Sequence, residues 1–135
     1  MESQKELILS GLAQVKPFSE LSNDGKELLK SGISWRKYEI GDRIYREDEM
    51  PDKVLFIVAG EGRLLGRSFR DNTLITLKKV GVGSLLGWAG LLRGQACETI
   101  QSSQDIEAIS IPSEIFVRLI LTEEAFRDYF KIKTN

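Results

Sequence analysis

The feature that most constrains the fold is a change of pattern along the chain, from helical spacing to short strand-like segments and back again. Between Ile33 and Ile111, segments rich in Ile, Val, Leu, Phe and Tyr alternate with Gly, Asp, Asn and Pro. Apolar segments bounded by turn residues predict strands, and strands spaced this closely are typical of a sandwich or barrel rather than of βαβ units. The predicted strands are 33–39, 42–46, 53–59, 62–69, 73–80, 97–102 and 105–111.

Helical patterns precede this strand-rich part. Apolar side chains over 3–16 are spaced to share one helical face. A second helix over 23–31 is expected to begin after Ser22, which is a suitable N-cap, and to end at Gly32. The sequence therefore predicts an α+β fold, in which an antiparallel, jelly-roll-like β-roll is flanked by helices at both ends. The predicted single domain, 1–135, divides into N-terminal helices over 1–32, the roll over 33–111 and C-terminal helices over 113–132.

Two short turns inside the strand-rich part complete the expected pattern. Gly60-Glu61-Gly62 and Asp71-Asn72 are typical of the turns that join two strands in a hairpin.

The C-terminal segment carries many large apolar side chains. Ser113 is the expected N-cap of its first helix, and Thr122 is expected to begin the second. Seven apolar residues are too many for two solvated helices, so part of this surface should pack on the roll and part on a second copy or the next domain. We expect residues 122–135 to be the more mobile part. The seven residues are Ile115, Phe116, Leu119, Ile120, Phe126, Tyr129 and Phe130.

Composition excludes several classes of function. The chain has 135 residues, a net charge of −1, a single cysteine and no histidine. The charge gives no basic footprint for nucleic acid, and the lack of histidine removes Ser-His-Asp triads, Cys-His dyads and histidine metal sites. The N-terminal residues lack the basic and apolar regions of a signal peptide. We therefore expect a cytoplasmic, non-catalytic protein with no metal, no cofactor and no membrane contact.

A glycine-rich stretch from Gly81 to Thr99 is the clearest candidate for a binding site. Within it, a glycine-rich turn leads into a short apolar segment, and polar residues follow that segment at once. Glycine allows a ligand to approach the backbone, and the start of a helix leaves amide N–H groups unpaired. The stretch therefore predicts a backbone site for an anion.

Several motifs together resemble the cyclic nucleotide-binding domain family. They are Pro17-Phe-Ser-Glu-Leu21, Tyr38-Glu-Ile-Gly-Asp-Arg-Ile-Tyr-Arg-Glu47, Asp52-Lys-Val-Leu-Phe-Ile-Val-Ala-Gly60, Gly81-Val-Gly83 with Gly87, and Asp105-Ile-Glu-Ala-Ile-Ser-Ile-Pro112. The resemblance covers about residues 17–121 and rests on the order and spacing of the motifs. It implies an eight-stranded β-roll that binds cAMP or cGMP and passes the signal to a neighbouring helix.

The resemblance also implies which positions form the phosphate-binding cassette. The family's ribose-binding glutamate falls on Trp88, and its phosphate-binding arginine falls near Ala96 or Cys97. Thr99 corresponds to the Ser/Thr near the phosphate. The expected ligand-binding positions are Gly83, Gly87, Trp88, Ala89, Ala96, Cys97 and Thr99.

The two substitutions predict weak binding or none. A charge-assisted contact is worth roughly 1.5–3 kcal/mol, or about tenfold to more than a hundredfold in affinity. Trp88 could stack on a flat ligand, or its indole could fill the space of the nucleotide. Arg93 could replace the missing arginine, or lie solvated in its loop.

The sequence-based hypothesis is a regulatory domain that relays ligand state to an attached effector through its C-terminal helices. The form of the cassette is similar to modules attached to bacterial ABC-type peptide exporters. The alternative is a degenerate, ligand-free module used for docking or for homodimerisation through the same helices. A cupin-type enzyme also has a β-roll, but cupin metal sites depend on histidine, which is absent.

Overall fold

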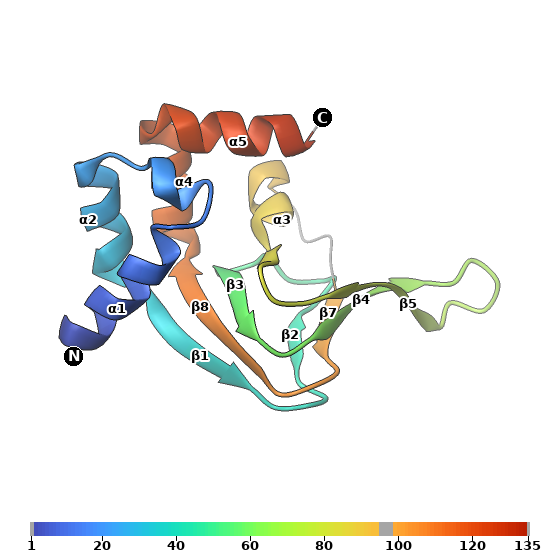
Figure 1. The fold of residues 1–135 in the computed structure, drawn as a ribbon. Helices are drawn as coiled ribbons and strands as arrows, with labels where there is room; N and C mark the ends of the chain where they lie inside the picture. Colours follow the sequence, from blue (N-terminus) through green and yellow to red (C-terminus); the bar gives the residue numbers. More distant parts are fainter. Residues whose placement is uncertain (1, 95–98, 135) are drawn as a thin grey trace. The chain divides into compact units, whose positions relative to one another are not determined.

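The computed structural model describes residues 2–94 and 99–134, and the side chains of 5–94 and 99–130. It has the α+β architecture expected from the sequence, with antiparallel sheets and helices before and after them (Figure 1). Two compact units can be distinguished. One contains the chain up to Ser34 together with the chain from Ile111 onwards, and the other is Trp35–Ser110. Each unit is described by itself below.

The β-roll consists of two four-stranded sheets. The first has the order β1-β8-β3-β6 and the second the order β2-β7-β4-β5. The pairs β3–β6, β2–β7, β4–β7 and β4–β5 are antiparallel. The strands are β1 (Ser34–Tyr38), β2 (Arg43–Tyr45), β3 (Lys53–Ala59), β4 (Gly62–Arg67), β5 (Leu74–Val80), β6 (Leu85–Leu86), β7 (Thr99–Ser102) and β8 (Ile106–Pro112).

A cluster of buried side chains from both sheets forms the core of the roll. Alternation along each strand sends one set of side chains inward, so strands from both sheets contribute to it. Tyr38 and Leu64 pack against the cluster from its margin. Its members are Ile44, Tyr45, Leu55, Ile57, Val80, Leu86, Ile100, Ile106 and Ala108.

The connection between β3 and β4 is not the hairpin that the sequence predicted, because the two strands belong to different sheets. Gly60 has a φ of +91°, and a Cβ there would collide with the carbonyl oxygen of Asp105. The carbonyl oxygen of Glu61 accepts hydrogen bonds from the backbone N–H groups of Ser103 and Gln104, at 3.0 and 3.1 Å. The glycine pattern therefore marks a close approach of two chain segments at a corner between the sheets.

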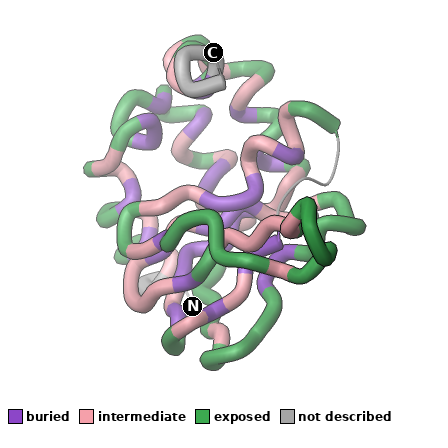
Figure 2. Tube along the Cα trace, turned by 90° about the vertical axis from the view of Figure 1, so that its right-hand side faces the viewer, coloured by how far each residue is buried: buried purple, intermediate pink, exposed green. Residues whose placement is uncertain are grey.

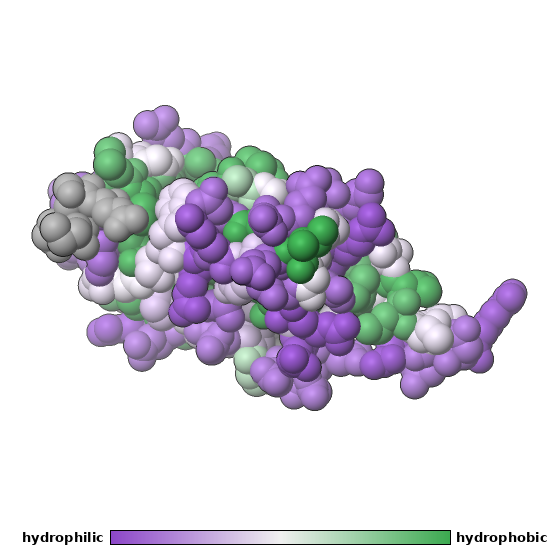
Figure 3. Space-filling view, turned by 90° about the horizontal axis from the view of Figure 1, so that it is seen from below, coloured by the Kyte–Doolittle hydropathy of each residue, from purple (hydrophilic) through white to green (hydrophobic). Residues whose placement is uncertain are grey.

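The hairpin predicted at Asp71-Asn72 is confirmed, since β4 and β5 pair on either side of it. Asn72 adopts a φ of +60°, and the N–H of Ser68 donates to the carbonyl of Thr73 at 2.8 Å. In the described part of the chain β7 pairs with Gly62–Leu65 of β4, whereas β4 and β5 stay paired as far as Arg67 and Leu74, so the hairpin continues as a two-stranded ribbon. Much of this ribbon is exposed (Figure 2). Seen from below, apolar side chains gather along it, short of its largely hydrophilic end (Figure 3).

The helical unit packs around aromatic side chains. Phe126 contacts Phe18 and Phe116 edge-to-face, with ring centroids 5.5 and 5.4 Å apart, and Phe130 lies 5.1 Å from Phe116 and from Phe126. All four rings are almost fully buried. The elements of this unit are α1 (Glu2–Leu12), the 3-10 helix η1 (Phe18–Glu20), α2 (Asn23–Gly32), α4 (Ser113–Thr122) and α5 (Glu124–Thr134).

This packing bears on one expectation about the C-terminal segment. Part of its seven-residue apolar surface was expected to lie on the roll and part on a second copy or the next domain; Phe126 and Phe130 are already buried in this chain and contact Phe18 and Phe116, and the rest of the expectation stays a prediction. Sequence spacing shows that such residues share a face, not which partner covers them. The greater mobility expected for residues 122–135 stays a prediction.

The predicted helix ends are partly right. Ser22 caps α2, as expected, by accepting a hydrogen bond from the N–H of Gly25 at 3.1 Å. The prediction that Ser113 caps α4 is wrong, because Pro112 occupies the N-cap position and makes no side-chain cap bond. Thr122 ends α4 rather than beginning α5; its hydroxyl donates to the carbonyl of Arg118. No helix in the described part of the chain is both long and apolar enough to span a membrane.

Candidate ligand-binding cassette

The glycine-rich stretch forms a strand, a tight turn and a short helix. After β6, Gly87 adopts a φ of +90° and precedes α3 (Trp88–Arg93), and Gly94, with a φ of +70°, ends that helix. Positive φ is readily adopted only by glycine, so the pattern seen in the sequence has a direct structural cause. Gly87, Trp88 and Ala89 therefore lie together on the first turn of α3, as the prediction of a backbone site at a helix start requires.

Tyr45 fixes the position of Gly87. A Cβ on Gly87 would lie 2.7 Å from the hydroxyl oxygen of Tyr45 and 2.9 Å from the carbonyl oxygen of Lys53. The Tyr45 hydroxyl lies within hydrogen-bond distance of two backbone carbonyl oxygens, 2.9 Å from that of Lys53 and 3.1 Å from that of Leu86. The buried side chain of Tyr45 therefore connects the turn before α3 to β2 and β3. The contact is possible only because residue 87 has no side chain.

Sequence reasoning did not assign Tyr45 a role at the cassette. Its signal was present, because Tyr45 is the second aromatic residue of the Tyr38–Glu47 motif. The ring is only 6% exposed, and the Lys53 ammonium lies 5.3 Å from its centroid. The same ammonium lies 3.1 Å from a carboxylate oxygen of Asp52, and this hydrogen bond lowers the pKa of Asp52.

The turn before β6 is tied to the neighbouring strand. The N–H of Gly83 donates to the carbonyl of Ile57 at 2.9 Å, and the N–H of Ile57 donates to the carbonyl of Ser84 at 3.0 Å. Gly83 has a φ of +90°, is exposed, and has no atom within 4 Å of the place where a Cβ would be. Gly83 therefore allows the backbone conformation of the turn, and its role in ligand binding stays a prediction.

Thr99 lies at the start of β7, on the opposite face of the sheet from the core. It pairs with Leu65, whereas the next residue, Ile100, pairs with Leu64 and belongs to the core cluster. Because side chains alternate along a strand, Thr99 faces away from that cluster. Its hydroxyl is nevertheless buried and accepts a hydrogen bond from the N–H of Glu47 at 3.1 Å.

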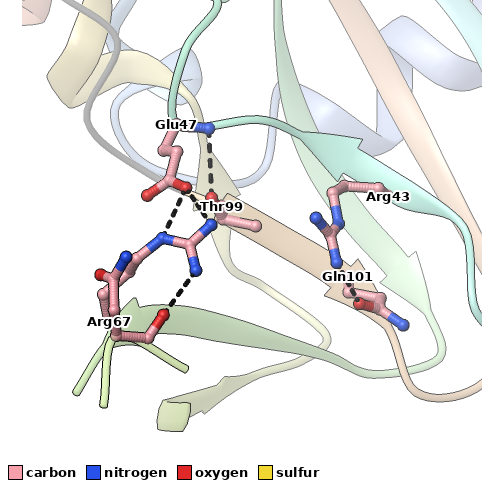
Figure 4. A network of polar contacts seen from close by, with 6 residues as sticks. Arg43, Glu47, Arg67, Thr99 and Gln101 are labelled. Carbon is pink, nitrogen blue, oxygen red and sulfur yellow. Dashed lines mark hydrogen bonds and ion pairs between the residues drawn. The ribbon is translucent and has the colours of Figure 1, made fainter. Parts of the chain in front are cut away.

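A polar network extends from Thr99 across the sheet (Figure 4). Arg67 donates through Nε and Nη2 to the same carboxylate oxygen of Glu47, at 3.1 and 2.9 Å, and through Nη1 to the carbonyl of Asn72 at 2.8 Å. Nearby, Nη2 of Arg43 donates to the side-chain oxygen of Gln101 at 3.2 Å. The network connects β2, β4 and β7 on the outer face of the second sheet.

Of the four remaining predicted ligand-binding positions, the structure describes two. Trp88 and Ala89 are half-buried on α3, so the two alternatives for the Trp88 indole stay open. Ala96 and Cys97 lie outside the described residues. Among the described residues there is no group of three or more His, Cys, Asp or Glu side chains that could hold a metal ion.

Residues 35–123 match the cyclic nucleotide-binding domain family. The chain belongs to this family. The match includes both sheets, the cassette and α4, and it agrees with the resemblance seen in the sequence motifs. No curated protein matches the sequence of the chain.

Solved structures of the cyclic nucleotide-binding fold are similar along almost the whole chain. The regulatory domain of Toxoplasma gondii PKA with cAMP has a TM-score of 0.83 at 15% identity, covering 98% of this chain and 50% of that one. The sensor domain of the transcriptional regulator DNR from Pseudomonas aeruginosa has a TM-score of 0.83 at 13% identity, with coverages of 99% and 89%. The regulatory subunit of a cAMP-independent protein kinase A from Trypanosoma cruzi, bound to guanosine, has 0.73 at 15%, with 98% and 50%. These identities show the shared fold alone, and the chain spans half the length of the Toxoplasma gondii and Trypanosoma cruzi chains.

Proposed function

We propose that this chain is a non-catalytic regulatory domain whose cassette binds cyclic nucleotides weakly or not at all, and whose C-terminal helices act on an attached effector. One observation carries the proposal. The cassette backbone is held in place through Gly87 and Tyr45, although the side chains expected at two ligand-binding positions differ from those of the family.

The weak binding of cyclic nucleotides is expected because two ligand-binding positions are substituted. Trp88 stands where the family has its ribose-binding glutamate, and a neutral side chain stands where it has its phosphate-binding arginine. Loss of the arginine removes a charge-assisted contact of roughly 1.5–3 kcal/mol, or about tenfold to more than a hundredfold in affinity. Loss of the ribose acceptor adds to this. Backbone amides at the start of α3 are what would remain for a ligand.

The structural relatives broaden the range of ligands to be tested. The Toxoplasma gondii domain is a complex with cAMP, whereas the Trypanosoma cruzi subunit is a complex with guanosine, which has no phosphate. A nucleoside needs no arginine to neutralise it. We therefore include guanosine beside the cyclic nucleotides as a candidate ligand.

The proposed output passes through α4 and α5. These helices follow the roll in the chain, and a shift between two of their arrangements is what a ligand would have to favour. The structural matches reported above include no ABC-type exporter, so we name no effector.

A second candidate function is docking without a ligand. Val117 and Leu121 are 36% and 69% exposed, and they lie four residues apart on α4. Residues at this spacing share one face of a helix, so α4 presents a small apolar surface. Failure of every nucleotide to bind, together with a concentration-dependent dimer, would favour this candidate.

Isothermal titration with cAMP, cGMP and guanosine tests the proposal. We expect no tight binding of cAMP by the natural chain. The double variant Trp88→Glu with Ala96→Arg should bind cAMP at least tenfold more tightly, because it restores both side chains. The matched control, Trp88→Gln with Ala96→Gln, changes the same positions without the charges and should gain nothing. Tight binding of cAMP by the natural chain would refute the proposal.

A further inference from the structure

Glu123 occupies the junction between α4 and α5. Its N–H donates to the carbonyl of Leu119 at 2.9 Å and so closes the last turn of α4. Its carbonyl accepts a hydrogen bond from the N–H of Arg127 at 3.0 Å and so opens the first turn of α5. One residue therefore ends one helix and begins the next.

The side chain of Glu123 reaches a third helix. One carboxylate oxygen accepts a hydrogen bond from the N–H of Ser22 and the other accepts one from the Ser22 hydroxyl, both at 2.7 Å. Ser22 is the N-cap of α2, where unpaired N–H groups and the helix dipole favour a negative charge. Such short, charge-assisted bonds are stronger than bonds between neutral groups. The carboxylate thus connects the α4–α5 junction to the start of α2.

Gly25 provides the space for this carboxylate. A Cβ on Gly25 would lie 2.8 Å from the carboxyl carbon of Glu123 and 2.9 Å from one of its oxygens. Gly25 lies in the first turn of α2 and is buried, where alanine would otherwise be the better helix residue. A glycine here is therefore explained by the carboxylate that it accommodates.

The contact lies at the surface, beside an open pocket of about 680 Å³ whose lining also includes Glu20, Asp24, Glu124 and Arg118. Both bonds to Ser22 are exposed to solvent. Because bonds that water can replace contribute a modest net free energy, a modest perturbation could open the contact.

The second attachment of α5 lies in its first two turns. Phe126 and Phe130 are buried in the aromatic cluster of the helical unit, and Nη1 of Arg127 donates to the carbonyls of Ile120 and Leu121 at 3.0 and 3.1 Å. A helix held at two points has a fixed direction. Without the contact between Glu123 and Ser22, α5 is held by this second attachment alone and can pivot about it.

We propose that the contact between Glu123 and Ser22 is a latch that fixes the direction in which α5 leaves α4. When the latch is open, α5 stays anchored by its two phenylalanines while the α4–α5 junction at Glu123 separates from the start of α2. The latch would give the domain the two arrangements of its C-terminal helices that the proposed function requires. To that extent the inference rests on the proposed function, but its test needs no nucleotide.

Hydrogen exchange measured by mass spectrometry on the whole chain tests the latch through two independent variants. Gly25→Ala keeps both Ser22 and Glu123 but displaces the carboxylate, and Glu123→Ala removes it. Each variant should accelerate exchange in peptides that cover 123–128 by about tenfold, as expected for the loss of a charge-assisted bond. In the Glu123→Ala background, Gly25→Ala should accelerate exchange no further, because nothing is left to displace.

The control is Glu124→Ala, which removes the neighbouring carboxylate of the same pocket. It should leave exchange in 123–128 unchanged. The latch is refuted if the effects of Gly25→Ala and Glu123→Ala add, or if Glu124→Ala has an equal effect. It is also refuted if exchange rises equally throughout α2, α4 and α5, because that result reports general destabilisation. None of these results would change the outcome of the nucleotide titration, so the two proposals can fail separately.

Discussion

The variant Gly87→Ala measures how firmly the cassette backbone is built into the roll. This substitution should lower the free energy of unfolding for two reasons. A non-glycine residue in the left-handed region costs about 1–2 kcal/mol. The added Cβ would also lie 2.7 Å from the Tyr45 hydroxyl oxygen and 2.8 Å from the adjacent ring carbon, so the ring must move. Overpacking of this kind, with weakening of the Tyr45 hydrogen bonds, costs about 1–3 kcal/mol more.

Gly41→Ala is the matched control. Gly41 has a φ of +92°, close to that of Gly87, but no atom lies within 4 Å of the place where its Cβ would be. It therefore carries the backbone cost of about 1–2 kcal/mol without the packing cost. We expect Gly87→Ala to lower the free energy of unfolding by about 2–5 kcal/mol in total, and always by more than Gly41→Ala.

Urea denaturation followed by tryptophan fluorescence provides the two free energies by linear extrapolation. If Gly87→Ala costs no more than Gly41→Ala, Tyr45 does not hold the turn, and the argument for a built cassette fails. If both variants are neutral, positive φ is not the reason for glycine at these two turns.

Two further predictions concern single side chains of the roll. The Tyr38 hydroxyl is buried and has no hydrogen-bond partner among the described residues, and burial raises its pKa above 10.0. The stability of the fold should therefore be complete below the unfolded pKa of about 10 and should fall as pH rises above it. Tyr38→Phe should be neutral or stabilising and should abolish this alkaline loss of stability in urea melts. Arg67 and Glu47 form an ion pair whose side chains are 43% and 47% exposed. Glu47→Gln should therefore lower the free energy of unfolding by less than about 1 kcal/mol, and this effect should shrink in 1 M salt. A loss of several kcal/mol would instead show that the network of Figure 4 is needed for the stability of the fold.

Local pattern was sufficient for strands that are clearly bounded by turn residues. The segment 53–59 coincides with β3, because turn residues bound a continuous apolar run. The two-residue strand β6 was not predicted, since it exists only through its pairing with Leu55 and Phe56 some thirty positions earlier. The corner at Gly60 was mistaken for a hairpin for the same reason. A glycine pattern shows that the backbone turns, but which strand lies beside it depends on distant residues.

The residues of the candidate site also fall into two groups, those that local sequence predicts and those that depend on distant residues. The glycines of the cassette could be predicted because a position with positive φ favours glycine, which is visible in the sequence itself. The role of Tyr45 could not, because it depends on a hydroxyl of β2 reaching the backbone of residues 53 and 86. Glu123 was also missed. A glutamate between two predicted helices is ordinary in a sequence, and the role of this one depends on its bonds to Ser22, a hundred residues earlier.

The ribbon formed by β4 and β5 has a consequence for how the protein behaves at high concentration. Among the described strands, β5 is the edge of its sheet, and such an edge offers unpaired N–H and C=O groups to any other chain. Ile75 and Leu77 on it are 46% and 59% exposed, which favours aggregation. Lys78 and Lys79 follow directly, and two copies approaching edge to edge bring these charges together. This protection is electrostatic, so it weakens as the Debye length falls from about 10 Å at 0.1 M salt to about 3 Å at 1 M. The solubility of this chain should therefore decline with added salt, before any change in its stability.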